Sequence, residues 1–134
     1  RLDCKWQSTE AGMVEHLMSS YARRKGSLFE TSVMKWLRGK GVSAERLRLA
    51  GKDDEGDIVC IVAGQPYIFE LKATVKMDLP GFWREAVAEA KNYAKARGMK
   101  QTPPAYVIVK RRNGSIEQSW VIQDLEQWLR LSQT

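Results

Sequence analysis

Hydrophobic residues recur at helical spacing in three stretches of the chain. The apolar stripe over residues 1–22 is narrow, and it favours an arm or a tag-like extension over a packed helix. Residues 27–41 carry their large apolar side chains on one face, with Ser27 as the expected N-cap and glycines at the end. A long helix is expected over residues 81–98, closed by Gly98.

Between these helices the hydrophobic pattern changes to the period of two that is typical of β-strands. The expected strands are residues 42–51, ending near Gly51, then 58–62, 67–73, 105–110 and 115–122. The last two should form a hairpin around Asn113 and Gly114. Asp124 should then cap a short terminal helix.

The resulting order is αβββαββα, which predicts an α/β fold with a mixed central sheet flanked by helices. The length of 134 residues fits one domain, which we place at 23–134 after the extension of residues 1–22.

Charged residues interrupt the first apolar hairpin. If Gly64 and Gln65 form its turn, Asp57 faces Lys72, and strand alternation puts Asp57, Glu70 and Lys72 on one side of the sheet. That side also carries apolar residues, so the charges should be paired or bind a metal there. The simpler alternative is a cross-strand ion pair on a solvated face.

This group of two carboxylates and a lysine contains no histidine, so it is better suited to bind a hard divalent cation than zinc. Mg²⁺ is usually held by one or two carboxylates together with phosphate oxygens. We therefore expect Mg²⁺ bound by Asp57 and Glu70, with Mn²⁺ as a substitute. Lys72 would position the attacking water or offset charge on phosphoryl oxygens. The sequence thus indicates phosphodiester hydrolysis.

The net charge of +6 is compatible with a polyanionic partner such as nucleic acid. Cys4 and Cys60 lie far apart in the sequence, and a buried thiol is expected at Cys60, which fits a reducing intracellular setting. No apolar run is long enough to span a bilayer, so we expect no membrane association.

An acid at a strand start followed by Glu-X-Lys on the next strand resembles the PD-(D/E)XK nuclease superfamily. Here the pattern is Asp57 and then Glu70-Leu71-Lys72, with Gly56 at the place of the usual proline. The resemblance implies a restriction-endonuclease-like core. It also implies that the Leu71 carbonyl is a further metal ligand.

The stretch "RRKGSLFETSVMKWLRGKG" and the segments after it, over residues 23–110, resemble archaeal-type Holliday-junction resolvases. This resemblance assigns a catalytic role to Glu30, four residues after Gly26, and contacts with the DNA backbone to Arg24 and Lys25. It further implies a homodimer that cuts four-way junctions and leaves 5′-phosphates. Such a small enzyme would fit a phage, a virus or an archaeon.

Charge and location alone add four expected DNA contacts, which are Arg46, Arg48, Lys52 and Lys76. The acidic loop of residues 53–55 could supply a further polar group from Asp53, Asp54 or Glu55, and the sequence does not choose among them. Three alternatives stay open, which are another structure-specific or repair endonuclease, a non-catalytic DNA-binding protein of the same fold, and an RNA-directed nuclease.

Overall fold

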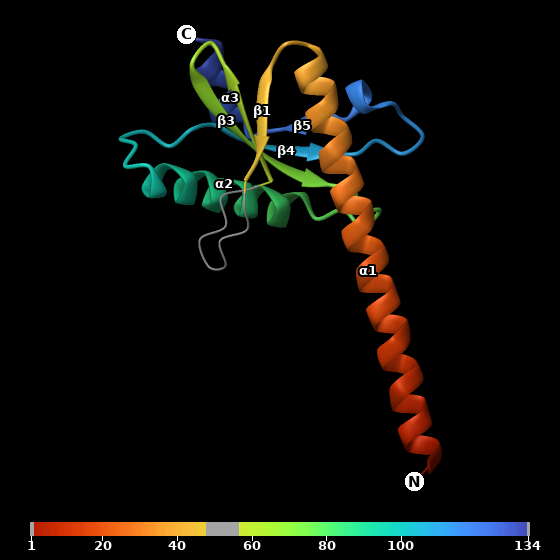
Figure 1. Cartoon of the computed structure of the whole chain (residues 1–134). Coiled ribbons are helices and arrows are strands. Elements are labelled where there is room, and N and C mark those ends of the chain that lie inside the picture. The colour runs from red at the N-terminus through yellow and green to blue at the C-terminus, as the bar shows by residue number, and fades with distance from the viewer. Residues whose placement is uncertain (1, 48–56, 134) are drawn as a thin grey trace.

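The computed structural model describes residues 2–47 and 57–133, with side chains from residue 10 onward. Within these residues, a five-stranded mixed sheet lies between two helices (Figure 1). The elements in chain order are α1 (Leu2–Gly39), β1 (Ser43–Arg46), β2 (Ile58–Val62), β3 (Gln65–Lys72), α2 (Leu79–Ala96), β4 (Ala105–Val109), η2 (Ile116–Gln118), β5 (Trp120–Ile122) and α3 (Leu125–Ser132). This order confirms the predicted α/β class, with a mixed central sheet flanked by helices and an added C-terminal strand and helix.

The strands lie side by side in the order β1-β2-β3-β4-β5. Only β3 and β4 run parallel among the described pairs, and α2 makes the crossover between them that a parallel connection requires. The other neighbouring strands are antiparallel. The Glu-X-Lys segment therefore lies on the central strand, between β2 and β4.

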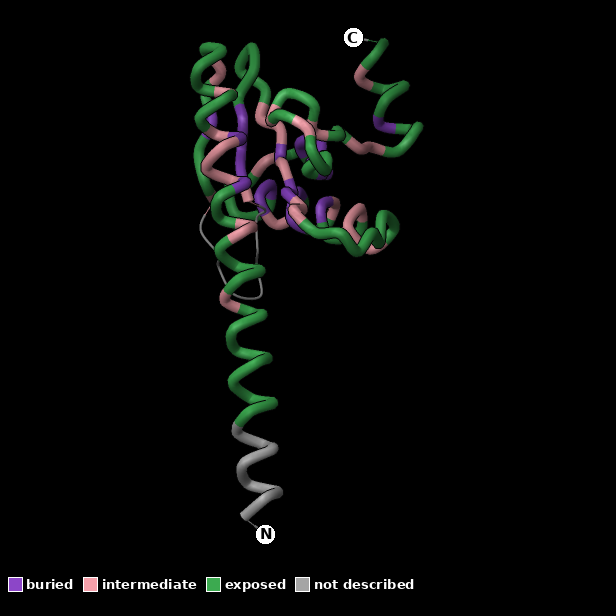
Figure 2. The backbone as a smooth tube through the Cα atoms, turned by 90° about the vertical axis from the view of Figure 1, so that its right-hand side faces the viewer, coloured by how far each residue is buried: buried purple, intermediate pink, exposed green. Residues whose placement is uncertain are grey.

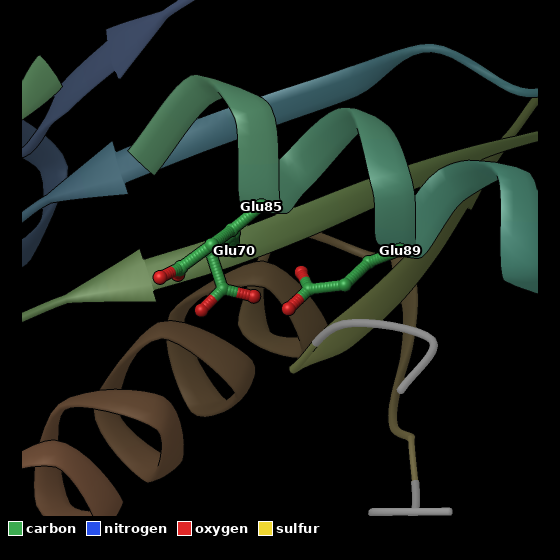
Figure 3. A group of neighbouring side chains, drawn as sticks. All are labelled: Glu70, Glu85 and Glu89. Atoms are coloured by element: carbon green, nitrogen blue, oxygen red, sulfur yellow. The ribbon is translucent and has the colours of Figure 1, made fainter. Parts of the chain in front are cut away.

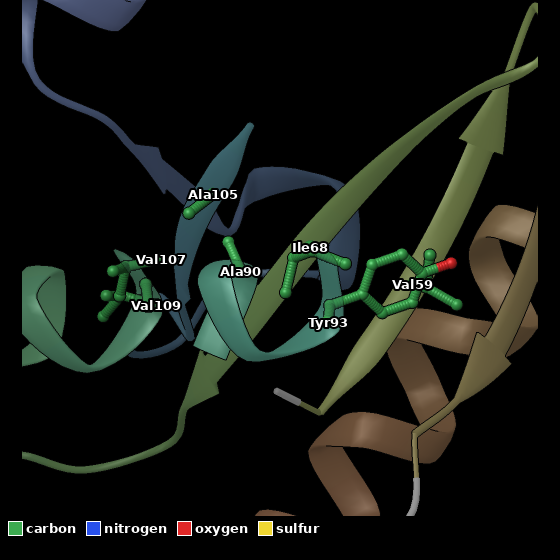
Figure 4. Packing of buried hydrophobic residues seen from close by; sticks show 8 residues of the cluster. Val59, Ile68, Ala90, Tyr93, Ala105, Val107 and Val109 are labelled. Atoms are coloured by element: carbon green, nitrogen blue, oxygen red, sulfur yellow. The ribbon is translucent and has the colours of Figure 1, made fainter. Parts of the chain in front are cut away.

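Each face of the sheet is covered by one helix, so the protein has two hydrophobic clusters. The cluster under α2 joins residues of that helix to the sheet: Ala86, Ala90, Tyr93, Val59, Ile68, Ala105, Val107 and Val109 (Figure 4). The cluster under α1 consists of Phe29, Val33, Ala44, Ile58, Cys60, Leu71 and Ile108. Burying a side chain such as Ile58 or Ile68 stabilises the fold by about 2 kcal/mol.

The turn between β2 and β3 differs from the predicted one. Ala63 and Gly64 form it, with φ values of 52° and 77°, because a tight hairpin turn needs left-handed backbone at both central residues. Val62 consequently pairs with Gln65, and every facing pair shifts by two residues relative to our expectation. Val59 faces Ile68 instead of Glu70. Since the shift is even, the predicted inward and outward residues keep their sides.

Helix α1 is longer than predicted. It continues without a break from Leu2 to Gly39, so the expected helix start with Ser27 as N-cap is wrong. Only the last third of the helix packs on the sheet, through Phe29 and Val33. Residues 10–24 are almost entirely exposed and extend away from the sheet, as Figure 2 shows.

Helix α2 begins two residues earlier than the pattern suggested. Asp78 is its N-cap, and the side chain accepts a hydrogen bond of 3.1 Å from the Gly81 N–H. Pro80 lies in the first turn, where its missing N–H costs nothing. A Cβ at Gly81 would come within 2.2 Å of the Asp78 carboxylate, so the glycine makes room for the cap.

The C-terminal region is not the tight hairpin that the sequence suggested. Residues 110–119 contain a turn and the short helix η2, and β5 is only Trp120–Ile122. The predicted terminal helix is confirmed, since the Asp124 carboxylate accepts a 2.8 Å bond from the Gln127 N–H. The buried Gln127 side chain bonds both backbone groups of Ala105, at 3.2 and 2.7 Å, and thereby ties α3 to β4.

Two expectations from composition and pattern can be compared with the structure, and a third falls outside the described residues. Cys60 is a buried free thiol, as expected, and burial raises its pKa. None of the helices in the described part of the chain is both long and apolar enough to cross a membrane. The predicted extension of the first strand to Gly51 lies outside the described residues beyond Leu47.

Candidate active site

The predicted acidic residues come from three elements that meet at one end of the central strand. Glu30 lies on α1, Asp57 immediately precedes β2, and Glu70 and Lys72 lie near the end of β3. The sheet and the two covering helices thus bring together residues separated by more than forty positions in the sequence. The following contacts show how closely they approach.

Asp57 is fixed by the edge of the sheet. Its N–H donates to the Phe69 carbonyl at 3.1 Å, and its own carbonyl accepts from the Leu47 N–H at 3.0 Å. The Asp57 carboxylate oxygen Oδ2 accepts a 2.7 Å bond from the Leu71 N–H. Asp57 therefore lies beside β3 at the end of the ladder, and our prediction that it stands opposite Lys72 is wrong by the same register shift.

Glu30 reaches this carboxylate from the α1 side of the sheet. Burial is the largest cause that raises the Glu30 pKa, to about 7, and the charge of Asp57 and a hydrogen bond with it raise it further. Arg46 opposes the shift with an ion pair of 3.8 Å between its Nε and the Glu30 carboxylate. Two carboxylates this close favour sharing a proton or a cation.

Glu70 approaches from the other side of the sheet, under α2. It is only 7% exposed, and its Oε2 atom is buried without a hydrogen-bond partner among the described residues. Burial raises the Glu70 pKa, and the nearby charge of Asp57 adds to the effect, whereas Glu89 and Lys72 lower it. A buried carboxylate oxygen with no donor is the kind of ligand that a cation would satisfy.

Lys72 lies among carboxylates on the same face as Glu70. Its Nζ is 2.6 Å from Glu85 and 3.4 Å from Glu70, and it lies 4.9 Å from the centre of the Phe82 ring. Burial lowers the Lys72 pKa, but the bonds and charges of Glu85 and Glu70 outweigh it, so the net pKa is raised. Lys72 is therefore a firmly charged ammonium beside the buried glutamate.

Two acidic residues of this region were missed by the sequence reasoning. Glu85 and Glu89 lie on α2, and together with Glu70 they offer carboxylate oxygens that all lie within 4.8 Å of one another (Figure 3). A signal for Glu89 was present, because it falls within the apolar stripe of Ala86, Ala90 and Tyr93 that faces the sheet. A carboxylate on a buried helix face needs a partner.

The Leu71 carbonyl points toward the same place. The N–H of Leu71 donates to Asp57, whereas the carbonyl of the next residue, Lys72, accepts from the Lys110 N–H on the opposite edge of β3. Within a strand, the N–H and C=O of one residue point to the same side. The Leu71 carbonyl therefore points toward the Asp57 side, where the metal-ligand role implied by the resemblance would require it.

A basic cavity of about 580 Å³ adjoins the end of β3 directly after Lys72. Its cationic lining comes from Lys25 on α1 and from Lys110 and Arg112 after β4, and Trp120 adds an aromatic surface. Lys25 was among the predicted DNA contacts. Lys110 and Arg112 were not, because nothing in the sequence places the segment after β4 beside Lys25.

The other predicted DNA contacts are not among the residues that line this cavity. Arg24 and Lys76 are exposed, on α1 and in the loop before α2. Arg46 is held against α1, where it contacts Glu30, the Ser27 carbonyl and the Thr31 hydroxyl. Outside the described residues lie Arg48, Lys52, Asp53, Asp54 and Glu55.

The structure is similar to that of Hjc, a Holliday junction resolvase from the archaeon Archaeoglobus fulgidus. The two chains share 24% identity, the match covers 64% of each chain, and the TM-score is 0.43. The match thus spans less than two thirds of the resolvase's length. No protein-family model and no curated protein matches the chain.

Proposed function

We propose that the protein is a divalent-cation-dependent endonuclease that hydrolyses DNA phosphodiesters. The observation that carries this proposal is the meeting of Glu30, Asp57 and Glu70 with the Lys72 ammonium at the end of the central strand. Acids in a partly buried place, one of them with an orphaned oxygen, form a donor set suited to Mg²⁺ or Mn²⁺.

Each residue of the site would have a separate role in the hydrolysis. Asp57, Glu70 and the Leu71 carbonyl would hold the cation, and Glu30 would complete the set or accept a proton from the attacking water. A bound divalent cation would supply positive charge to the phosphoryl oxygens and acidify water. Lys72 would orient the water or stabilise the charge that develops on the phosphate, because its ammonium stays protonated beside Glu70 and Glu85.

The basic cavity supports a nucleic-acid substrate. Lys25, Lys110 and Arg112 line a hollow that continues from the strand end carrying Lys72, so a phosphate backbone lying there would pass the acidic residues. The net charge of +6 acts in the same direction, since it favours association with a polyanion.

Among DNA substrates we propose the four-way junction, cut by a homodimer. This finer assignment depends on the resemblance of residues 23–110 to archaeal-type resolvases. A twofold dimer carries two equivalent sites, and a junction presents two equivalent strands, so the symmetries match. Other structure-specific or repair endonucleases share the same core chemistry, and the substrate panel below separates them.

The test is cleavage of four-way junction, flap, nicked and linear duplex DNA of matched sequence, each with Mg²⁺ and with a chelator. We expect cation-dependent cleavage with preference for the junction. Glu70→Gln should reduce the rate by at least about 100-fold while DNA binding changes little. Glu10→Gln, an exposed site on the outer part of α1, is the matched control and should cleave normally.

Two outcomes would overturn the proposal at different levels. Equal cutting of linear duplex would reject the junction assignment and leave a general endonuclease. DNA binding without cleavage in any divalent cation would reject the enzyme and favour the non-catalytic DNA-binding alternative.

A further inference from the structure

We infer that the basic cavity beyond Lys72 binds one unpaired base of a DNA strand, with Trp120 as the surface on which the base stacks. This inference rests on the proposed function, because it states which form of DNA lies beside the cation site. The basic cavity is the hollow of about 580 Å³ that adjoins the end of β3.

Exposed apolar side chains form part of the wall of this cavity. Val75 is 82% exposed, Met77 51% and Trp120 53%, and all three line the cavity. Large apolar side chains that lie together on an exposed surface are typical of a binding site. A site that held only phosphates would use cations and hydrogen-bond donors. The apolar part of the wall therefore indicates a ligand that also has an apolar or aromatic face.

Cationic side chains line the same cavity. They are Lys25 from α1 and Lys110 and Arg112 from the segment after β4. None of the three forms an ion pair with a carboxylate among the described residues. A nucleotide carries both an anionic phosphate and an aromatic base, so it complements the cations and the apolar wall together.

The kind of surface that the cavity offers selects an unpaired base over a duplex. In a duplex the faces of the bases are stacked on one another, and only the base edges are accessible in the grooves. A base must leave this stack before it can lie on an aromatic side chain. The volume of about 580 Å³ lies within the roughly 300–1,000 Å³ of small-ligand pockets, which is suitable for one nucleotide.

The register of the strands places Trp120 near Lys72. Lys72 pairs with Val109 of β4, and Val109 pairs with Trp120 of β5. Paired residues point to the same face of a sheet, so the three side chains form one row across neighbouring strands. Because adjacent strands lie about 4.8 Å apart, Trp120 is roughly 10 Å from Lys72. At about 3.4 Å per nucleotide along one strand, the bound base belongs to a nucleotide about three positions from the phosphate at Lys72.

The ring of Trp120 is held in place by Arg111. The guanidinium carbon of Arg111 lies over the ring, 5.1 Å from its centre, and such a contact is attractive. The ring nevertheless stays half exposed and lines the cavity. A ring that is already positioned loses little conformational freedom when a base binds, so the stacking energy contributes to affinity.

The experiment measures binding of the full chain to a labelled single-stranded oligonucleotide, with a chelator present so that no cation-dependent cleavage occurs. An abasic oligonucleotide of the same length keeps the phosphates and lacks the bases, and the fully paired duplex is the third ligand. Trp120→Ala should weaken binding of the normal oligonucleotide by about 5- to 150-fold, the loss expected for one stacked base. Its binding of the abasic strand and the duplex should stay nearly unchanged, and Trp120→Phe should retain most of the affinity.

Trp128→Ala is the matched control, because Trp128 is 51% exposed and is not among the residues that line the cavity. It should bind all three ligands like the unmodified chain. Val75→Ser changes an exposed loop position and keeps the test valid if the change at Trp120 disturbs folding. This variant should weaken binding of the normal oligonucleotide and leave that of the abasic strand unchanged.

Two results would overturn the inference. One is equal affinity of the unmodified chain for the normal and abasic strands, and the other is an equal loss for both strands in Trp120→Ala. Because binding is measured with the cation chelated, the result does not depend on cleavage. A chain that prefers the normal strand through Trp120 but cleaves no DNA with any divalent cation would overturn the proposed enzyme and support the base site.

Discussion

Replacing Glu30 by glutamine should stabilise the cation-free protein above neutral pH and leave its stability almost unchanged in acid. In the folded state burial and Asp57 raise the Glu30 pKa from 4.5 to about 7. The folded protein therefore binds more protons than the unfolded chain between these pH values. The free energy of unfolding therefore decreases as pH rises from about 4.5 to about 7, and above that range the protein bears the full destabilisation from a charged Glu30.

The size of the effect follows from the shift. A rise from 4.5 to about 7 corresponds to about 3 kcal/mol at 1.36 kcal/mol per pH unit. Glu30 is 26% exposed on its side chain, so burial and not solvent dominates its environment. The lost ion pair with the more exposed Arg46 subtracts only a few tenths of a kcal/mol. For a domain of this size, about 3 kcal/mol raises the Tm by about 10 °C.

The assay is urea unfolding with a chelator at about pH 4 and about pH 8, with Glu30→Gln compared with the unmodified protein. The variant should be more stable at the higher pH only. Glu10→Gln, on the exposed part of the same helix, should show no such difference. An equal change at both pH values, or a loss of stability at the higher one, would refute the assignment of a raised pKa to Glu30.

Three further predictions concern the fold and the basic cavity. Gln127→Leu should lower the free energy of unfolding in urea by about 2–4 kcal/mol, because it leaves the N–H and the carbonyl of Ala105, at the start of β4, without their hydrogen-bond partner. A decrease of less than about 1 kcal/mol would contradict this. Gly64→Val, at a φ of 77°, should destabilise by about 1–2 kcal/mol, whereas Gly26→Ala, in mid-helix with open space around it, should stabilise by about 0.5–1 kcal/mol. Lys110→Ala and Arg112→Ala should each weaken DNA binding and lower the slope of log K against log salt by about 0.9, and an unchanged slope would exclude phosphate contact.

The sequence predicted the order of elements because most strands and helices carry a strong local period. It placed the turn of the first hairpin wrongly, since both Ala63-Gly64 and Gly64-Gln65 offer turn residues and only the packed sheet selects between them. This error did not change which side chains point to each face of the sheet, because the register shifted by two residues. Similarly, Ser27 is a residue type that favours N-caps, yet the helix continues through it, because helical residues precede it and the residues after it are held on the sheet by tertiary contacts.

For the site, the sequence could indicate which residue types matter along β2 and β3. The apolar stripe of α2 signals that Glu89 is buried, but it does not indicate that Glu89 lies beside Glu70, because that distance depends on how the crossover helix packs on the sheet. The same holds for Lys25 and Lys110, which are separated by most of the chain and share one cavity. Contacts between elements distant in the sequence leave no periodic trace in it.

The long helix α1 carries a consequence for local opening of the backbone. Residues around Val33 are held by the sheet, while those around Met13, Leu17 and Tyr21 have exposed side chains and rely on helical hydrogen bonds alone. Isolated helical segments are only marginally stable in water. Amide hydrogens along α1 should therefore exchange with solvent deuterium progressively faster from Val33 toward Met13, so that one continuous helix contains both the slowest and the fastest exchanging turns.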